Sequence, residues 1–192
     1  MKIGLYFGSF NPIHIGHLVI ANHLAEHSDL DQIWFVVTPH NPFKKKSSLL
    51  DNYQRLEMVY RATKDYTKLK PSDIEFNLPQ PNYTINTLVH LQEKHPDYEF
   101  ALIMGEDNLK SFHKWKNYQV IIENHDIYVY PRISKDNTET QFHTHNKVHF
   151  IDAPIMEISS TFIRNSIKTG KNVKPMLPEY VWEYLDEMNF YK

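Results

Sequence analysis

The chain has 192 residues, of which 41% are hydrophobic and 23% are charged, and these values fit one globular domain that can bury a sizeable core. Its formal net charge of −2 gives no overall basic field for nucleic acid, and the absence of cysteine excludes disulfides and thiolate zinc sites. No apolar segment of about 18 residues and no signal-peptide pattern occurs, so we expect a cytoplasmic protein without a membrane partner. From the charge we expect no nucleic-acid partner.

Short apolar runs alternate along the chain with longer segments of helical pattern. The runs are rich in β-branched and aromatic residues and predict strands at 2–7, 32–37, 100–105, 126–130 and 147–152. Helices are predicted at about 15–27, 52–65, 84–94, 118–123, 160–170 and 178–188. This alternation predicts an α/β fold, a Rossmann-like doubly wound parallel sheet with helices on both faces. Such sheets bind ligands beyond the carboxyl ends of their strands, at the topological switch point.

The most irregular segment is 134–146, for which we expect a mobile loop. It overlaps the histidine-rich stretch FHTHNKVH at 142–149. We interpret this stretch as a solvated loop that leads into a strand, because supporting carboxylates are missing; a metal site is the alternative.

The stretch GSFNPIHIGH, residues 8–17, contains two of the five glycines and lies between the first predicted strand and the first predicted helix. Gly8 would let the chain turn sharply and let a ligand approach the backbone. The N-terminal amides of the helix would form an anion site. His14 and His17 are three apart, so they share one face of the first turn, and Gly16 leaves room for a ligand. We interpret the stretch as a phosphate-binding loop; histidines that only cap a helix are the alternative.

The stretch ISSTFIR, residues 158–164, begins the helical pattern that follows the last predicted strand. Ser159 and Ser160 can cap free backbone amides, or can turn those donors and their own hydroxyls toward a phosphate. Arg164 lies one turn further on, where its guanidinium can reach the same anion. A plain capped helix with a surface arginine is the alternative.

Further residues that could bind a ligand lie near the predicted strand 100–105 and the helix before it. Asp107 follows the carboxyl end of this strand, where a carboxylate can accept hydrogen bonds from ribose hydroxyls. Trp115 could stack on a flat ring or pack in the core. Thr84 could donate a hydrogen bond to a ligand and could also be the N-cap of its helix.

These motifs resemble the nucleotidyltransferase superfamily that includes the class I aminoacyl-tRNA synthetases, whose H-I-G-H signature is found here at residues 14–17. The longer pattern G-S-F-N-P-x-H-x-G-H is similar to the adenylyltransferase branch, in which Thr and Asp often replace Ser9 and Asn11. ISSTFIR matches the family's I-S-S-T-x-I-R at every fixed position. The resemblance implies a HIGH-motif nucleotidyltransferase domain over 1–192, with a helical extension at about 155–192 that carries the second motif.

In that family, the two histidines bind the phosphates of ATP and stabilise the charge of the reaction. The resemblance therefore implies a catalytic set of His14, His17, Lys44 and Arg164, the last two offsetting charge on the leaving pyrophosphate. It also implies that ATP contacts Gly8, Ser9, Phe10, His14, His17, Gly105, Asp107, Ile158, Ser159, Ser160, Thr161 and Arg164. We expect Mg²⁺ to bridge the phosphates, held mainly by substrate and water rather than by a protein cage.

Two segments resemble the nicotinate mononucleotide adenylyltransferases in particular. GEDNLKSFHKW, residues 105–115, looks like the family segment whose tryptophan stacks on the pyridine ring, which implies this role for Trp115. NYTINTL, residues 82–88, resembles the segment whose Tyr–Thr pair lines the pyridine carboxylate site, here Tyr83 and Thr84.

The stretch TPHNPFKKK, residues 38–46, is similar to a family loop of Asn, Pro and a basic residue that closes on substrate phosphates. This similarity adds Asn41 and Lys44 to the substrate site, with Lys45 next in line; a solvated basic loop is the alternative. Arg132 stands roughly where the family has a basic residue that contacts substrate. Arg55 also recurs in the family, and we interpret it as structural.

The resemblance predicts transfer of AMP from ATP to nicotinate mononucleotide, which yields deamido-NAD and pyrophosphate in NAD biosynthesis. The same chemistry on nicotinamide mononucleotide or another acceptor such as phosphopantetheine is one alternative, and a non-catalytic nucleotide sensor is another. A nucleic-acid-binding module related to tRNA synthetases is disfavoured by the short chain, the near-neutral charge and the absence of a KMSKS-like segment. The sequence leaves the oligomeric state open, a homo-oligomer included.

Overall fold

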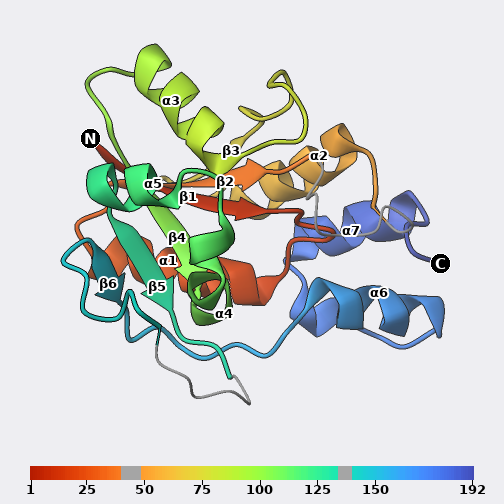
Figure 1. Cartoon of the computed structure of the whole chain (residues 1–192). Coiled ribbons are helices and arrows are strands. Elements are labelled where there is room, and N and C mark those ends of the chain that lie inside the picture. The colour runs from red at the N-terminus through yellow and green to blue at the C-terminus, as the bar shows by residue number, and fades with distance from the viewer. Residues whose placement is uncertain (40–48, 134–139) are drawn as a thin grey trace.

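The computed structural model describes residues 1–39, 49–133 and 140–192. In this part of the chain, parallel strands form a six-stranded sheet in the order β3–β2–β1–β4–β5–β6 (Figure 1). The strands are β1 (Lys2–Gly8), β2 (Gln32–Val37), β3 (Leu69–Ser72), β4 (Glu99–Gly105), β5 (Ile127–Tyr130) and β6 (Val148–Phe150). Strand order reverses between β1 and β4, which places the switch point where β1 meets α1 and β4 meets α4.

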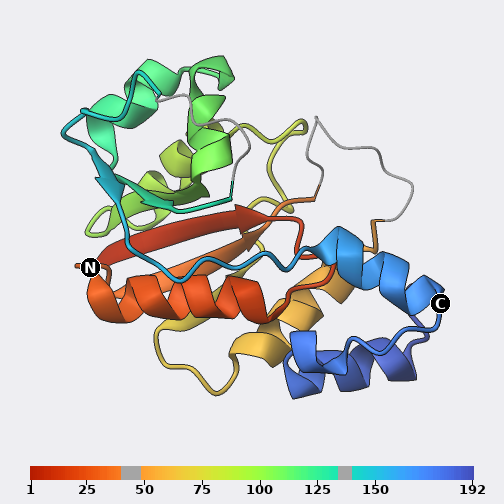
Figure 2. The ribbon, with the colours of Figure 1, turned by 90° about the horizontal axis from the view of Figure 1, so that it is seen from below.

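Helices cover both faces of this sheet, as predicted. Figure 2 shows α1 and α2 on one side of the strands and α3, α4 and α5 on the other. The helices are α1 (Ile15–His27), α2 (Asn52–Thr63), α3 (Thr84–Lys94), α4 (Glu106–Lys110), α5 (Tyr118–Asn124), α6 (Ser160–Lys168) and α7 (Glu179–Glu187), with 3-10 turns η1 (Phe112–Lys114) and η2 (Lys174–Met176). Both views place α7 beside α2. No helix among the described residues is long and apolar enough to cross a membrane.

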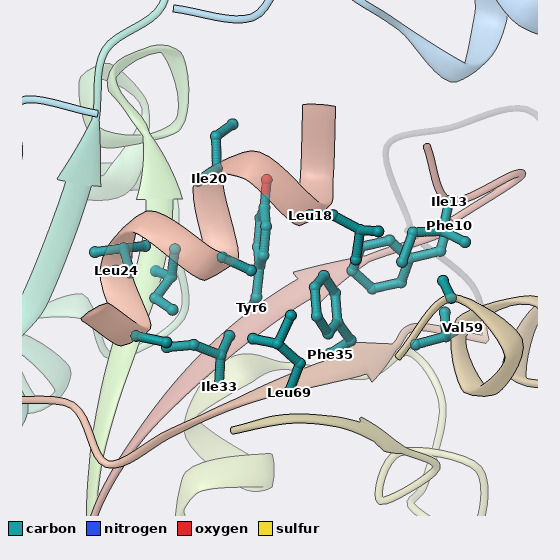
Figure 3. Close-up of a cluster of buried hydrophobic side chains, with 14 of the residues drawn as sticks. Tyr6, Phe10, Ile13, Leu18, Ile20, Leu24, Ile33, Phe35, Val59 and Leu69 are labelled. Atoms are coloured by element: carbon teal, nitrogen blue, oxygen red, sulfur yellow. The ribbon is translucent and has the colours of Figure 1, made fainter. Parts of the chain in front are cut away.

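Strands β1, β2, β4 and β5 read as continuous apolar runs because each of them supplies both core layers. In β2, Ile33 and Phe35 point to the layer under α1, whereas Val36 points to the layer under α3 and α5. Figure 3 shows the first layer, where Tyr6 and Phe35 meet helix α1. The same layer extends into α6 and α7 through buried residues of those helices: Ile163, Val181 and Leu185.

Two short elements, β3 and α4, were not predicted from the sequence patterns. Strand β3, LKPS, is mostly polar and contains Pro71, which an edge strand tolerates. Helix α4 has 5 residues, too few to show a helical period. The segment predicted as a loop at 134–146 is described only from residue 140, where turns lead into β6 as expected.

Candidate active site

The loop between β1 and α1 turns at Phe10, whose φ of 44° is left-handed, and not at Gly8, where the sequence predicted the turn. Gly8 ends β1, and a Cβ there would lie 2.7 Å from the Phe10 ring. The ring itself is buried against Phe35 and His17. Only the main chain of Phe10 is therefore placed to contact a ligand.

The carbonyl groups of this loop are bound by other parts of the protein. The Gly8 carbonyl accepts from the N–H of Thr38 at 2.9 Å, and the Ser9 carbonyl accepts from the Arg55 guanidinium at 2.7 Å. The Asn11 carbonyl accepts from the Arg164 guanidinium at 2.8 Å, and the Pro12 carbonyl accepts from the Ser160 hydroxyl at 2.8 Å. Two of these partners belong to ISSTFIR, so the structure brings together motifs that are 148 residues apart. The loop is thus fixed in one conformation by hydrogen bonds that need no ligand.

His14 and His17 lie at the start of α1, as the spacing predicted. Their rings stack with centroids 3.7 Å apart, and the main-chain N–H of His14 donates to Nδ1 of His17 at 3.2 Å. An Nδ1 that accepts a hydrogen bond assigns the proton of neutral His17 to Nε2. His17 thereby presents an N–H donor at the far side of its ring.

His14 is 4% exposed, and burial, aided by the positive charge of Arg132, lowers its pKa to about 4. Its Nδ1 has no hydrogen-bond partner within the described ranges. A Cβ on Gly16 would come within 3.1 Å of this nitrogen, so the glycine keeps space for the ring. A buried neutral imidazole beside a guanidinium is poised to gain a proton or donate one when an anion arrives.

The ISSTFIR residues have separate roles in this structure. Ser159 is the N-cap of α6 and accepts from the N–H of Phe162, so its capping alternative holds. Ile158 packs on the first core layer. Arg164 binds the Asn11 carbonyl and donates to the Thr161 hydroxyl at 3.3 Å. Its guanidinium therefore lies against the loop expected to bind phosphate.

A pair of charged residues lies on the β4 and β5 side of the switch point. Gly105 ends β4, Asp107 follows in α4, and Nε of Arg132 lies 3.8 Å from Oδ1 of Asp107. Arg132 also donates to the Tyr130 hydroxyl at 3.5 Å, and Tyr6 donates to the same oxygen at 3.2 Å. Asp107 and Arg132, predicted for different substrates, thus lie together, and the charge of Arg132 acts on His14.

The two segments expected to bind the pyridine ring are neighbours. Tyr83 is 37% exposed, and the Lys116 ammonium lies 4.6 Å from its ring centroid. Trp115 is half-buried and packs edge-on against Phe112, so one part of the indole remains exposed. The N-cap of α3 is Tyr83, not Thr84, which is the first helical residue.

Comparison with known proteins identifies the family. A family model described as cytidylyltransferase-like matches residues 5–166. The chain belongs to this family. A Flavobacterium johnsoniae protein named "Probable nicotinate-nucleotide adenylyltransferase" is 72% identical over 192 residues and covers 100% of both chains. A Bacteroides fragilis protein of the same name is 46% identical over 182 residues, which are 95% of this chain and 90% of that one. The resemblance stated from the motifs is confirmed.

Solved structures agree with the cytidylyltransferase-like fold. Plasmodium falciparum nicotinic acid mononucleotide adenylyltransferase complexed with NaAD superposes with a TM-score of 0.81, at 20% identity over 99% of this chain and 97% of that one. The same protein complexed with APC gives a TM-score of 0.79 over 99% and 96%. At this identity the likeness concerns the fold alone.

In this cytidylyltransferase-like chain, Arg55 is structural, as interpreted from the sequence. It is fully buried, and its guanidinium donates to oxygens of Ser9, Thr38, Pro39, Leu50 and Asn52. Burial lowers its pKa to about 10, so it stays charged at neutral pH. Arg55 ties the loop after β1 to the loop after β2.

Some sequence predictions lie outside the described residues, namely Asn41, Lys44 and Lys45. The histidine-rich stretch does lead into β6, and His149 lies 3.2 Å from Asp126. Across 1–39, 49–133 and 140–192, no group of three or more His, Asp or Glu side chains could hold a metal ion.

Sequence reasoning passed over two residues that support the site. Asn11 is 3% exposed, and its side-chain oxygen accepts from the Leu50 N–H at 3.3 Å and from the Tyr191 hydroxyl at 2.6 Å. Tyr191 is 180 residues away in sequence. A contact at this separation leaves no local pattern in one sequence, so only the fold reveals it.

Proposed function

We propose that the protein transfers AMP from ATP to nicotinate mononucleotide, producing deamido-NAD and pyrophosphate in NAD biosynthesis. The observation that carries this proposal is the junction of the two motifs, where Arg164 and Ser160 bind the carbonyls of Asn11 and Pro12. The relatives that bear the corresponding name at 72% and 46% identity support the same reaction.

The proposed reaction needs no nucleophile from the protein. An oxygen of the acceptor's 5′-phosphate attacks the α-phosphorus of ATP in line, and the bond from this phosphorus to the bridging oxygen breaks as pyrophosphate leaves with the electron pair. Catalysis then consists of alignment and charge stabilisation. His17 donates through Nε2–H to the phosphates, and His14 joins it as the anion raises its proton affinity.

The remaining charges follow from the predicted positions. Arg164 and Lys44 would offset charge on the leaving pyrophosphate, and Asp107 would accept from the ribose of ATP. Mg²⁺ would enter with ATP and neutralise phosphate charge. The donors that this site does offer, imidazole and guanidinium groups, suit the phosphates rather than the metal.

The acceptor would lie along Tyr83, Thr84 and Trp115, with its ring on the exposed part of the indole. Arg132 and Asn41 complete the proposed contacts to it. Proximity supports this assignment, because Lys116 links the tryptophan segment to Tyr83. The proposal includes one domain over 1–192, since residues of α6 and α7 share the first core layer. It also includes a cytoplasmic location. It leaves room for a homo-oligomer.

An end-point assay tests the proposal. The protein is mixed with ATP, Mg²⁺ and equal amounts of nicotinate and nicotinamide mononucleotide, and the dinucleotide products are separated by chromatography. Deamido-NAD as the dominant product is expected. Mostly NAD would keep the chemistry and overturn the acceptor. No dinucleotide from a folded protein that binds ATP would point to another acceptor or to a nucleotide sensor.

A further inference from the structure

Asn11 lies at a junction of four segments that are distant in sequence. Its main-chain carbonyl accepts from Arg164 of α6, and its side-chain oxygen accepts from Leu50, just before α2, and from Tyr191, after α7. The bond from Tyr191 is the shortest of these, at 2.6 Å. The segment that follows α7 therefore contacts the loop between β1 and α1 directly.

The backbone after α7 places the Tyr191 hydroxyl beside Asn11. Asn189 has a φ of 53° and lets the N–H of Phe190 donate to the Leu185 carbonyl at 3.0 Å, which closes the helix. Tyr191 itself has a φ of 64°. A bulky residue in the left-handed region is costly and persists where other contacts determine it, a situation that is concentrated at functional sites. In this conformation the Tyr191 hydroxyl donates to the side chain of Asn11.

The electrostatic setting keeps Tyr191 a donor. Burial raises the pKa of its hydroxyl, although the positive charges of Arg164 and Arg55 oppose this shift. At neutral pH the phenol is therefore protonated. Both arginines also bind the main chain of the loop, at Asn11 and Ser9, so the three side chains hold one short segment together.

We propose that Tyr191 is a positioning residue for the nucleotide site: its hydroxyl holds Asn11 so that the loop at residues 8–12 keeps the shape that receives the phosphates of ATP. This inference rests on the proposed function, because it assigns a role in ATP binding to a contact outside both motifs. Tyr191 acts through Asn11 and needs no contact with ATP.

The test compares Tyr191→Phe with wild type. Phenylalanine keeps the ring in its packing and removes only the donor. Tyr180→Phe is the matched control, since Tyr180 is 41% exposed on α7 and contributes its ring to Lys64. Affinity for a non-hydrolysable ATP analogue is measured by calorimetry, and kcat and KM are measured separately for ATP and for nicotinate mononucleotide.

Tyr191→Phe should weaken analogue binding and lower kcat/KM for ATP by about fivefold, the factor that matches one neutral hydrogen bond. KM for the mononucleotide and all constants of Tyr180→Phe should stay within about twofold of wild type. A Tyr191→Phe protein with a lower melting temperature but wild-type analogue affinity would overturn the inference, because the bond would then be merely structural.

A double-mutant cycle with Asn11→Ser tests the route. If Tyr191 acts through Asn11, Tyr191→Phe should have little further effect in the Asn11→Ser background, and fully additive losses would contradict this route. The two proposals also fail differently. A wild type that binds the analogue but produces no dinucleotide contradicts the proposed function, while analogue affinity still decides the role of Tyr191.

Discussion

The main-chain N–H of His14 donates to Nδ1 of His17 across 3.2 Å, so a single imidazole both caps α1 and presents an Nε2–H donor. The two halves of the ring can be separated by substitution. Asparagine offers an oxygen near the position of Nδ1 but has no donor at the position of Nε2, whereas alanine offers neither. The cap and the proposed phosphate contact should therefore respond independently.

We expect His17→Asn to lower turnover on the order of a hundredfold, equivalent to about 3 kcal/mol, as for removal of an oxyanion donor. His17→Ala should show a similar kinetic loss and in addition lose about 1 kcal/mol of stability with the cap. Pyrophosphate release and urea unfolding measure the two effects. A fall in turnover of less than about threefold in both variants would contradict the catalytic role of His17.

The second prediction concerns the protonation of His14. Burial is the larger cause of its pKa of about 4, and Arg132 is the smaller one. In Arg132→Gln the pKa should rise yet remain below 6.5, its ordinary value. NMR titration of the imidazole in wild type, Arg132→Gln and the charge control Arg61→Gln measures this shift. An unchanged or lower pKa in Arg132→Gln would show that the two side chains do not interact.

The same pKa has a consequence for stability. Between pH 6.5 and about 4 the unfolded chain binds a proton at His14 that the folded chain does not, so stability falls as pH decreases through this window. Binding of an ATP analogue should raise the pKa of His14 above its value of about 4 in the free protein, because the phosphates favour the imidazolium. An analogue that binds without moving this pKa would place the phosphates elsewhere.

The third prediction concerns Glu75, which is 2% exposed and accepts from the Thr87 hydroxyl of α3 at 2.8 Å. Burial raises the pKa of this carboxyl above 4.5, against the opposing hydrogen bonds of Thr87 and Thr38. The folded state therefore binds the proton more tightly, and wild type loses stability as pH rises from 4.5 through the folded-state pKa.

Glu75→Gln cannot ionise and should escape this loss. The unfolding free energy of Glu75→Gln, taken relative to wild type, should thus increase as pH rises from 4 to 8. Urea titrations across this range give the difference, with Glu93→Gln, exposed on α3, as the control for removing one carboxylate. A difference that stays constant with pH would mean that Glu75 titrates alike in both states.

The sequence predicted what depends on local pattern. Continuous apolar runs predicted the central strands, because residues such as Ile33 and Val36 must meet both layers. The motif at residues 8–17 was found at the end of the first strand, since spacing and residue type carry that information. Strand β3 was missed because LKPS holds its place by pairing with β2 rather than by its own composition.

Contacts across the fold could not be predicted in the same way. The left-handed turn lies at Phe10 because its ring must enter the core, a requirement that glycine preference alone does not reveal. Asp107 and Arg132 were assigned to different substrates and lie 3.8 Å apart. Arg164 was expected to face a phosphate and binds the Asn11 carbonyl, which shows that a motif specifies residue types but not their resting partners.

The last prediction concerns Arg55, whose buried guanidinium donates to five oxygens around the loops after β1 and β2. Lysine keeps the charge but offers three donors from a single point, so Arg55→Lys leaves carbonyl groups such as that of Ser9 without a partner. We expect a loss of about 3 kcal/mol in unfolding free energy, measured by urea denaturation.

Arg61→Lys is the matched control on the same helix. Arg61 lies in a partly exposed pair with Glu57 and over the Tyr184 ring, and this substitution should change stability by about 1 kcal/mol or less. Arg55→Lys should also weaken ATP-analogue binding, since Ser9 belongs to the loop at residues 8–12. A variant that is destabilised but binds the analogue normally would show that Arg164, Ser160 and Tyr191 suffice to hold this loop. A variant as stable as wild type would contradict the structural role of Arg55.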